Sequence, residues 1–452
     1  MKIKLYRSST IGININGFKI LQDPWLTDGE YYGSWSHYPF YDLDSNLEEI
    51  NSYDMIYISH IHPDHCSDKT MKKINKNIPI YIHKYHLKFL KNKLHRLGFK
   101  VFELENNKRH EVSKDVFINI IAADNCDPEL CFKFTGCADL NIKSEEGSQW
   151  IDSLCIFDDN INVLMNINDC PFELAKNTFD SIKKQYDKID ILLTGFGGAG
   201  PYPQCFENYN LSEKKIAAQK KQKQFLDQAI NYITELQPLY YLPFAGTYTL
   251  TGNLSKLQSL RGVPSIDYAY NYIDNYLSTN KKLSQIKPIK INNDETFDLH
   301  SKQCSKQYEK INLHNYNEYI KNNLLNKKLD YETNPNVSFD EVYELSKTAF
   351  NHFLDKKLIN NISLETDVYI KILNKFIKIS KENILEVINK ENFTNNSQYV
   401  IYDIEPRMLK MLLQGPKYAH WNNAEIGSHI KFYRNPNIFE RNIYLSMCNF
   451  HN

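Results

Sequence analysis

The sequence predicts an α/β fold, and three observations support this prediction. Short apolar strands alternate with helical segments through the first half of the chain. One of these strands, at residues 55–59, runs directly into a segment that is dense in histidine and aspartate. From residue 254 the composition turns polar and rich in Asn and Lys, which predicts that the α/β region ends near this point.

The N-terminal strands form a meander that delivers Asp23 to the edge of a sheet. Strands are expected at residues 2–6, 12–16 and 18–22, with Asn16-Gly17 as a hairpin turn because these residues tolerate positive φ. Further strands are expected at 55–59, 78–82, 100–104, 116–123, 153–158, 162–168, 189–194 and 240–244. Helices are expected at 68–74, 83–97, 173–184 and 211–236. The last of these helices carries lysines that we expect to form a solvated face: Lys214, Lys215, Lys220, Lys221 and Lys223.

The C-terminal part predicts a smaller α+β unit. Residues 334–452 contain several helical segments and a strand region at 398–404, followed by a helix at 406–413. We expect this accessory region to complete a pocket or to mediate self-association, so a homo-oligomer is one expected state.

Composition limits the class of protein and its partners. The 452 residues include 54 basic and 54 acidic side chains. Because these charges balance, the net charge of the protein gives no reason to expect binding to nucleic acid or to an anionic membrane. The nine cysteines are scattered without a CxxC pair, which argues against a secreted disulfide framework. The first residues read as a strand, and no apolar run approaches the roughly 20 residues of a membrane helix. We therefore expect a soluble cytoplasmic protein.

The segment after the strand at 55–59 has the composition of a metal site. His60 and His62 stand two residues apart and can project to one side, where two neutral imidazoles can hold a divalent ion. Pro63 turns the backbone, so Asp64 and His65 can serve a second ion or hold an activated oxygen on the first. The alternative, a polar loop with chance histidines, is disfavoured because histidine is scarce.

The motif His-x-His-x-Asp-His after an apolar strand resembles the metallo-β-lactamase superfamily. More narrowly, the chain resembles the catalytic domain of the CMP-N-acetylneuraminate hydroxylase family, without that family's Rieske domain. This resemblance rests on Asp23-Pro24-Trp25-Leu26, Ser59-His60-Ile61-His62, Thr194 to Gly200, Leu236-Gln237-Pro238, Pro243-Phe244-Ala245-Gly246, Ile426-Gly427 and Arg434-Asn435-Pro436. It implies a metallo-β-lactamase-type αββα sandwich with a C-terminal α+β accessory region. The expected division is a metal domain at 1–255, a polar connecting region at 256–333 and the accessory region at 334–452.

The resemblance also implies further metal ligands. It places Asp127, where the family has a histidine, at the ligand position after the strand at 116–123, with Asp124 as the competing candidate and a structural acidic turn as the alternative. Asp169 matches the superfamily's bridging aspartate, although it could instead cap the helix that follows. The superfamily's last histidine is replaced by Ala245-Gly246, so one or two ions are expected. A carboxylate in place of imidazole favours iron or manganese over zinc.

Four residues are candidates for contacting the substrate, and one for supporting the ligands. Trp35 lies in an aromatic loop that could wall a pocket or simply pack on the core. Gly197 and Gly198 belong to a glycine-rich turn whose N–H groups could face an anion, or which could be a turn without a ligand. Tyr248 follows the strand at 240–244 at the same edge. Asp23 is expected to support the ligands from behind.

These residues lead to two enzyme hypotheses. The first is an iron-dependent oxygenase, monooxygenase-like, which hydroxylates an amino-sugar or nucleotide-linked small molecule with electrons from a separate donor protein or from the substrate itself. The second is a metal-dependent hydrolase of a phosphodiester, lactone or amide, in which Asp64 orients a hydroxide and acts as the catalytic residue. Iron is the expected metal, with zinc or manganese as alternatives. A scaffold protein on a degenerate site is disfavoured because so many ligand residues occur together.

Overall fold

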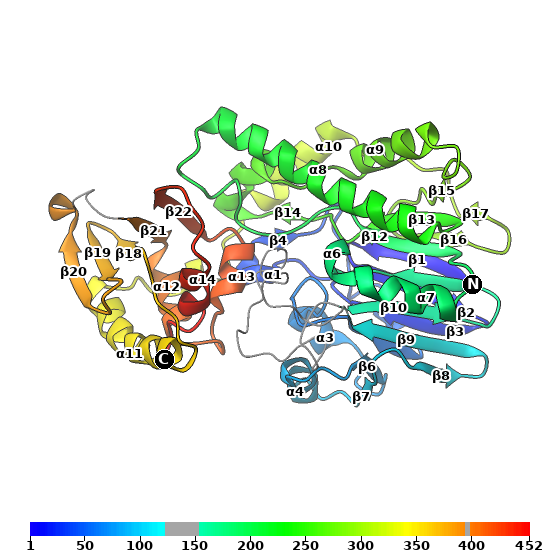
Figure 1. The fold of residues 1–452 in the computed structure, drawn as a ribbon, viewed down its shortest axis with the longest axis horizontal. Coiled ribbons are helices and arrows are strands. Elements are labelled where there is room, and N and C mark those ends of the chain that lie inside the picture. The colour runs from blue at the N-terminus through cyan, green and yellow to red at the C-terminus, as the bar shows by residue number, and fades with distance from the viewer. Residues whose placement is uncertain (123–152, 394–397) are drawn as a thin grey trace.

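Two β-sheets pack face to face in the larger lobe of the molecule (Figure 1). The structure is a computed structural model that describes residues 1–122, 153–393 and 398–452. The first sheet contains, in spatial order, β17 (Gln303–Cys304), β16 (Glu295–Asp298), β1 (Lys2–Arg7), β2 (Thr10–Ile15), β3 (Phe18–Gln22), β5 (Met55–Tyr57), β6 (Ile80–His83) and β7 (Val101–Leu104). The second contains β15 (Lys287–Pro288), β13 (Tyr240–Phe244), β12 (Ile191–Gly195), β11 (Val163–Asn166), β10 (Ser153–Asp158), β9 (Val116–Ala122) and β8 (Arg109–Ser113).

The interface between the two sheets is apolar because alternate side chains of each strand point into it. β2 contributes Ile11, Ile13 and Ile15 from the first sheet, and β9 contributes Ile118 and Ile120 from the second. These buried, mostly β-branched residues hold the two sheets at a fixed spacing, so the ends of strands from both sheets meet along one edge.

Helices cover the outer face of each sheet and complete four layers. The first sheet is covered by α2 (Leu47–Asn51), α3 (Asp68–Lys73) and α4 (Phe89–Arg96), and the second by α6 (Phe172–Ala175), α7 (Phe179–Gln185), α8 (Leu211–Leu236) and α9 (Ile266–Thr279). The long helix α8 begins at a capping box in which Asn210 and Glu213 exchange side-chain to backbone hydrogen bonds. The predicted αββα sandwich is confirmed.

The predicted boundary at residue 255 is wrong, because the segment 256–333 returns to the sandwich. β15 adds to the second sheet beside β13, and β16 adds to the first sheet beside β1. α9 buries one stripe, which includes Tyr270, Ile273 and Leu277, while its other side is polar. That polar side gives the segment the composition of a linker although it is part of the core. α10 (Leu313–Tyr319) then leads towards the second lobe.

The smaller lobe is a mixed sheet with helices packed on one face. Its strands are, in spatial order, β20 (Leu385–Asn389), β19 (Lys375–Ile379), β18 (Asp367–Ile372), β21 (Tyr399–Ile404) and β22 (Ile430–Asn435). The helices α11 (Phe339–Ile359), α12 (Pro406–Leu413) and α14 (Arg441–Met447) share an apolar core with this sheet. The segments α1 (Glu30–Gly33), β4 (Trp35–Ser36), β14 (Thr249–Leu250) and α13 (Trp421–Ile426) lie where the two lobes meet (Figure 1).

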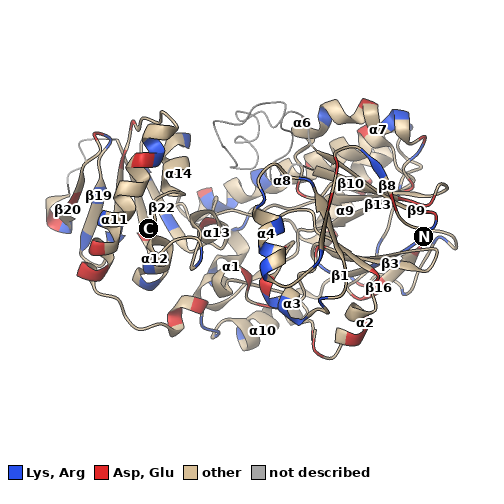
Figure 2. Ribbon diagram, turned by 90° about the horizontal axis from the view of Figure 1, so that it is seen from below, with Lys and Arg blue, Asp and Glu red and all other residues tan. Residues whose placement is uncertain are grey.

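Charge is distributed evenly over the molecule. Basic and acidic residues are interspersed along both lobes in Figure 2, as the equal numbers of the two kinds lead one to expect. Within the described ranges, no helix combines the length and the apolar character that crossing a membrane requires.

Candidate metal centre

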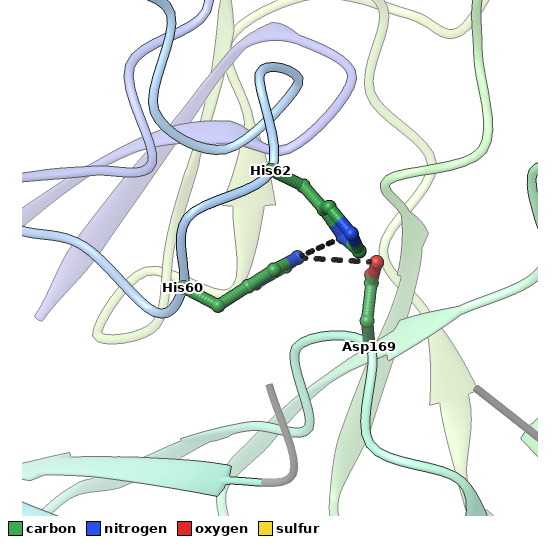
Figure 3. Close-up of side chains that lie close together, drawn as sticks. All are labelled: His60, His62 and Asp169. Atoms are coloured by element: carbon green, nitrogen blue, oxygen red, sulfur yellow. Dashed lines mark hydrogen bonds and ion pairs between the residues drawn. The ribbon is translucent and has the colours of Figure 1, made fainter. Parts of the chain in front are cut away.

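The histidine-rich segment leaves the end of β5 where strands of both sheets terminate. β3 runs parallel to β5 and is followed by Asp23, while β11 in the second sheet is followed closely by Asp169. Because the carboxyl ends of these strands share one edge, side chains distant in sequence converge there. Figure 3 shows His60 and His62 from the first sheet pointing towards Asp169 from the second.

Two histidines and one carboxylate form the first group of donor atoms. His60 Nε2 lies 3.0 Å from His62 Nδ1 and 3.6 Å from Asp169 Oδ2. One donor atom from each of the three residues lies within 4.8 Å of the others. Two imidazole nitrogens that face each other beside a carboxylate oxygen are a typical donor set for a divalent transition metal.

Asp169 also belongs to a second group, together with Asp64 and His65. His65 Nε2 lies 3.3 Å from Asp169 Oδ1 and 3.7 Å from Asp64 Oδ2. Asp169 therefore turns one carboxylate oxygen to each group. A carboxylate shared in this way can offset the repulsion between two neighbouring cations.

Two of the imidazoles are fixed from behind by hydrogen bonds at their other nitrogen. Asp23 Oδ2 lies 2.9 Å from His65 Nδ1, and Ser59 Oγ lies 2.9 Å from His60 Nδ1. Asp23 also accepts hydrogen bonds from the Ser59 backbone N–H at 2.7 Å and from Ser59 Oγ at 2.8 Å. These bonds set the ring orientations and leave Nε2 of both rings free to face the donor groups.

Burial and charge divide the histidines into two kinds. Burial lowers the pKa of His60 well below its usual value and also lowers the pKa of His62, so both rings are neutral near pH 7. Burial acts in the same direction on His65, but the carboxylates of Asp169, Asp23 and Asp64 outweigh it and raise the pKa of His65 well above its usual value. Neutral rings and carboxylates are the protonation states that a metal site requires, and a cation bound beside His65 would have to displace its proton.

Two further segments at this edge were considered for metal ligands in the sequence. Asp127, and its competitor Asp124, lie outside the described residues. After β13, Gly246 packs against Phe196 and Gly197, and a Cβ on Gly246 would lie 2.9 Å from the Phe196 ring. This close packing explains why the chain has glycine, and not a side chain with donor atoms, at that strand end.

Tyr31 is a site residue that the sequence did not single out. Its hydroxyl donates a hydrogen bond to Asp64 Oδ1, and its backbone carbonyl accepts one from His429 Nε2 at 2.7 Å. Tyr31 has a φ of 50°, an uncommon value for an aromatic residue, and it lines the cavity beside the donor groups. The sequence showed only an aromatic loop here, because the contact with Asp64 depends on how the loop folds.

The predicted roles of Trp35 and Tyr248 in contacting substrate need correction. The two rings stack on each other with centroids 3.5 Å apart and planes 7° apart, and both are buried. The guanidinium of Arg261 covers Tyr248 at 4.1 Å. These residues fill an aromatic cluster behind Tyr31 and do not line the cavity.

The glycine-rich turn after β12 does line the cavity, at Gly197 and Gly198. A Cβ on Gly198 would lie 2.0 Å from the ring of Phe225 on α8, so this position requires glycine. Lys221, also on α8, donates to the carbonyls of Ala199 at 2.9 Å and Tyr202 at 3.0 Å. The expectation that this lysine is solvated is therefore wrong, because it holds the turn in place.

Lys214 also departs from the expected solvated face of α8. Its side chain is largely buried and pairs with Glu207 at 3.0 Å. Lys215, Lys220 and Lys223 are exposed, as expected.

A cavity of about 790 Å³ extends from the donor groups to the smaller lobe. His62, Asp64 and Asp169 line it from the sandwich, and Glu425 and Arg434 line it from the smaller lobe. Its volume falls in the range of about 300–1,000 Å³ that is usual for pockets that bind small molecules.

Comparisons with known sequences agree with this architecture. The family described as beta-lactamase superfamily domain matches residues 2–156. A Mycobacterium tuberculosis protein named as a Rieske 2Fe-2S iron-sulfur protein is 26% identical over 235 residues, which cover 50% of this chain and 40% of that protein. The cytidine monophosphate-N-acetylneuraminic acid hydroxylase of Danio rerio is 25% identical over 245 residues, 51% of this chain and 35% of that protein. The chain thus spans two fifths or less of the length of these relatives.

Solved structures with a similar arrangement include enzymes of two kinds. CmlA, a diiron β-hydroxylase from Streptomyces venezuelae, has a TM-score of 0.41 and 13% identity, covering 64% of this chain and 52% of that one. Igni18, a metallo hydrolase from Ignicoccus hospitalis, has a TM-score of 0.40 and 13% identity, covering 66% and 98%. The chain thus matches the model of a beta-lactamase superfamily domain over residues 2–156, folds as an αββα sandwich, and is similar to the cytidine monophosphate-N-acetylneuraminic acid hydroxylases.

Proposed function

We propose that this protein is an iron-dependent oxygenase of the hydroxylase type, acting on an amino-sugar or nucleotide-linked small molecule. Similarity to the cytidine monophosphate-N-acetylneuraminic acid hydroxylases supports the reaction type and the substrate class. The main structural support for the proposal is the position of Asp169, whose carboxylate turns one oxygen to each of the two donor groups. The proposed ligands are His60, His62, Asp64, His65 and Asp169, with Asp127 as a further one.

The balance of donors favours iron or manganese over zinc. Asp64 and Asp169 both belong to the donor groups, and hard carboxylates suit iron and manganese better than they suit a typical zinc site. Bound iron would supply the chemistry with O2 that the side chains cannot provide themselves. The residues of the chain then have the tasks of holding the metal, orienting the substrate and moving protons.

Asp64 is the proposed catalytic residue because it combines exposure to the cavity with fixed geometry. Its Oδ1 accepts a hydrogen bond from Tyr31, and its Oδ2 faces His65 at 3.7 Å. Its backbone carbonyl accepts a further hydrogen bond from Ser9 Oγ. A carboxylate held in this way can accept a proton at the cavity wall without moving.

Electrons for an oxygenase reaction need a source, and we propose a separate donor protein. Within the described residues, the metal-binding groups consist of histidine and aspartate only, and no cysteine belongs to them. The mycobacterial relatives are named for a Rieske 2Fe-2S centre, but this chain matches only two fifths of their length.

The alternative is a metal-dependent hydrolase of a phosphodiester, lactone or amide. The geometry that favours it is the same shared carboxylate, since two adjacent cations can also activate water for hydrolysis. In that case Asp64 would orient the attacking water. The metal that the protein selects separates the two functions.

The test is to express the protein with iron and zinc both available and to measure the bound metals by elemental analysis. Stoichiometric iron, with an absorption change when O2 is added to the reduced protein, is the expected result. Tight zinc with O2-independent phosphodiester cleavage would establish the hydrolase instead. A His60→Ala, His62→Ala double variant should lose the metal, while His95→Ala, an exposed histidine on α4, should keep it. Retention of metal and activity by the double variant would exclude both enzyme functions.

A further inference from the structure

The smaller lobe lines the cavity with an arginine set among aromatic rings. Arg434 stands at the end of β22, and its guanidinium carbon lies 4.7 Å from the ring centroid of Phe206, 5.0 Å from Phe439 and 6.0 Å from Phe432. We call these four residues the Arg434 pocket. The backbone of Arg434 is fixed by Asn208, which accepts from its N–H at 2.8 Å and donates to its carbonyl at 2.7 Å.

Arg434 lacks an ionic contact of the kind that three other arginines of the chain make. Arg7, Arg109 and Arg407 each form an ion pair with an aspartate or a glutamate. Within the described part of the chain, the guanidinium of Arg434 forms no such pair, although Glu425 stands near enough to interact with it electrostatically. Partial burial removes some of the hydration of the Arg434 charge and so lowers the pKa of this side chain. A desolvated guanidinium that faces a cavity without a carboxylate partner is suited to bind an anion from a ligand.

Helix α13 connects the Arg434 pocket to the metal centre. Asn422 near its start hydrogen-bonds to His62, and its side-chain amide donates to Tyr444 Oη at 2.6 Å. Glu425 lies three residues later, on the same side of the helix, and also lines the cavity. Burial raises the pKa of Glu425 to about 8, so near pH 7 this side chain is neutral and would not repel an anion bound beside it.

We propose that the Arg434 pocket binds an oxyanion of the substrate, a carboxylate or a phosphate, while the group to be oxidised lies at the metal centre. The inference rests on the proposed function only in taking the metal centre as the reacting end of the cavity. The guanidinium offers two parallel N–H donors to the oxyanion, and the buried ring of Phe206 excludes water from one side of the contact. Glu425, between the two ends, offers a hydrogen bond to a hydroxyl or amide group of the same molecule.

The test measures binding of three probes to the full chain by titration calorimetry. The probes are inorganic phosphate, cytidine monophosphate and N-acetylneuraminic acid, which separate a phosphate group from a carboxylate group. Arg434→Met should weaken the binding of at least one probe by about tenfold or more, because a charge-assisted hydrogen bond is lost. Arg434→Lys keeps the charge but loses the paired donors and should give an intermediate affinity. Lys431→Met is the matched control, since it removes the same charge from the exposed side of the same strand.

The pattern of losses identifies the oxyanion. Weaker binding of phosphate and cytidine monophosphate assigns the pocket to a phosphate group, and weaker binding of N-acetylneuraminic acid assigns it to a carboxylate. The inference is overturned if no probe binds the wild type in the millimolar range, or if Arg434→Met and Lys431→Met have equal effects. Circular dichroism confirms that each variant is folded. Calorimetry measures binding without any catalytic turnover. The result for the Arg434 pocket is therefore independent of whether the protein catalyses the oxygenase reaction.

Discussion

The metal centre and the Arg434 pocket are two ends of one cavity, but the chain builds them differently. At the metal centre, four of the five donor residues lie within six positions of one another, and Ser59 and Asp23 fix two of the rings through hydrogen bonds to their Nδ1 atoms. The residues of the Arg434 pocket come from distant parts of the chain: Phe206 lies in a loop before α8, and the other three lie more than 200 residues later, in and after β22. The proposed metal chemistry is therefore encoded locally on the αββα sandwich, while the proposed recognition of the substrate depends on how the second lobe packs against it.

This contrast predicts that variants can disable one end and spare the other. Asp169→Ala should have the largest effect, because it removes a donor oxygen from both groups at once. We expect metal affinity to fall by more than about 100-fold, beyond the range found for residues that only support ligands. Elemental analysis after gel filtration measures it, with the exposed Asp180→Ala as the control. Full metal content in Asp169→Ala would remove this residue from the centre, and probe binding at the Arg434 pocket should survive.

Phe206→Ala should lower the stability of the fold and leave the metal affinity unchanged. The ring of Phe206 stacks on Phe432 at 5.2 Å, and the neighbouring backbone of Cys205 and Glu207 hydrogen-bonds to Phe432. Removing a buried ring at this junction should lower the free energy of unfolding by about 3 kcal/mol. Urea unfolding measures the loss, and Phe89→Ala, whose ring is exposed, should change it little. Loss of metal from Phe206→Ala would contradict the separation between the two ends.

Asp23→Asn tests how strongly the metal centre depends on residues behind the ligands. The carboxylate accepts hydrogen bonds from Ser59 and lies 2.9 Å from His65 Nδ1. An amide of the same shape turns an N–H towards one of these partners, so the ring of His65 loses its preferred orientation. Metal affinity should fall by about 10- to 100-fold, less than for Asp169→Ala. A competition assay with a chelator measures it, and an unchanged affinity would show that the His65 ring is fixed by other contacts.

The same contrast explains what could be predicted from the sequence. The helix at 211–236 and the strand at 153–158 have the predicted bounds, because apolar periodicity and a capping box are local signals. The resemblance to the metallo-β-lactamase superfamily implied that Asp169 joins His60, and in the structure both residues stand just beyond buried strands. Arg434 could not be interpreted in this way, because neither its aromatic neighbours nor its lack of a carboxylate partner is visible in its own segment.

Two other misses have the same cause. Lys221 looked solvated in a lysine-rich helix, yet it bonds to the carbonyls of a distant turn. β8, at Arg109–Ser113, was not predicted because its residues are polar and stand at the edge of the sheet, where side chains need not be apolar.

The smallest predicted effect concerns pH and joins the two ends through α13. Burial raises the pKa of Glu425 to about 8, while the charge of Arg434 acts in the opposite direction. Between the ordinary pKa of a glutamate, about 4.5, and this value, the folded state keeps a proton that the unfolded state releases, so the wild type loses stability as pH rises through this window. Glu425→Gln does not titrate, and its melting temperature relative to the wild type should therefore increase from pH 5 to pH 9. The Arg434→Met substitution should extend the upper limit of this window to higher pH, because the positive charge that favours the ionised carboxylate of the folded state is lost. The control is the exposed Glu382→Gln variant, whose melting temperature should differ from that of the wild type by the same amount at every pH. If Glu425→Gln also shows a difference that does not change with pH, Glu425 is ionised in the folded protein. An ionised Glu425 would repel an anion bound at Arg434.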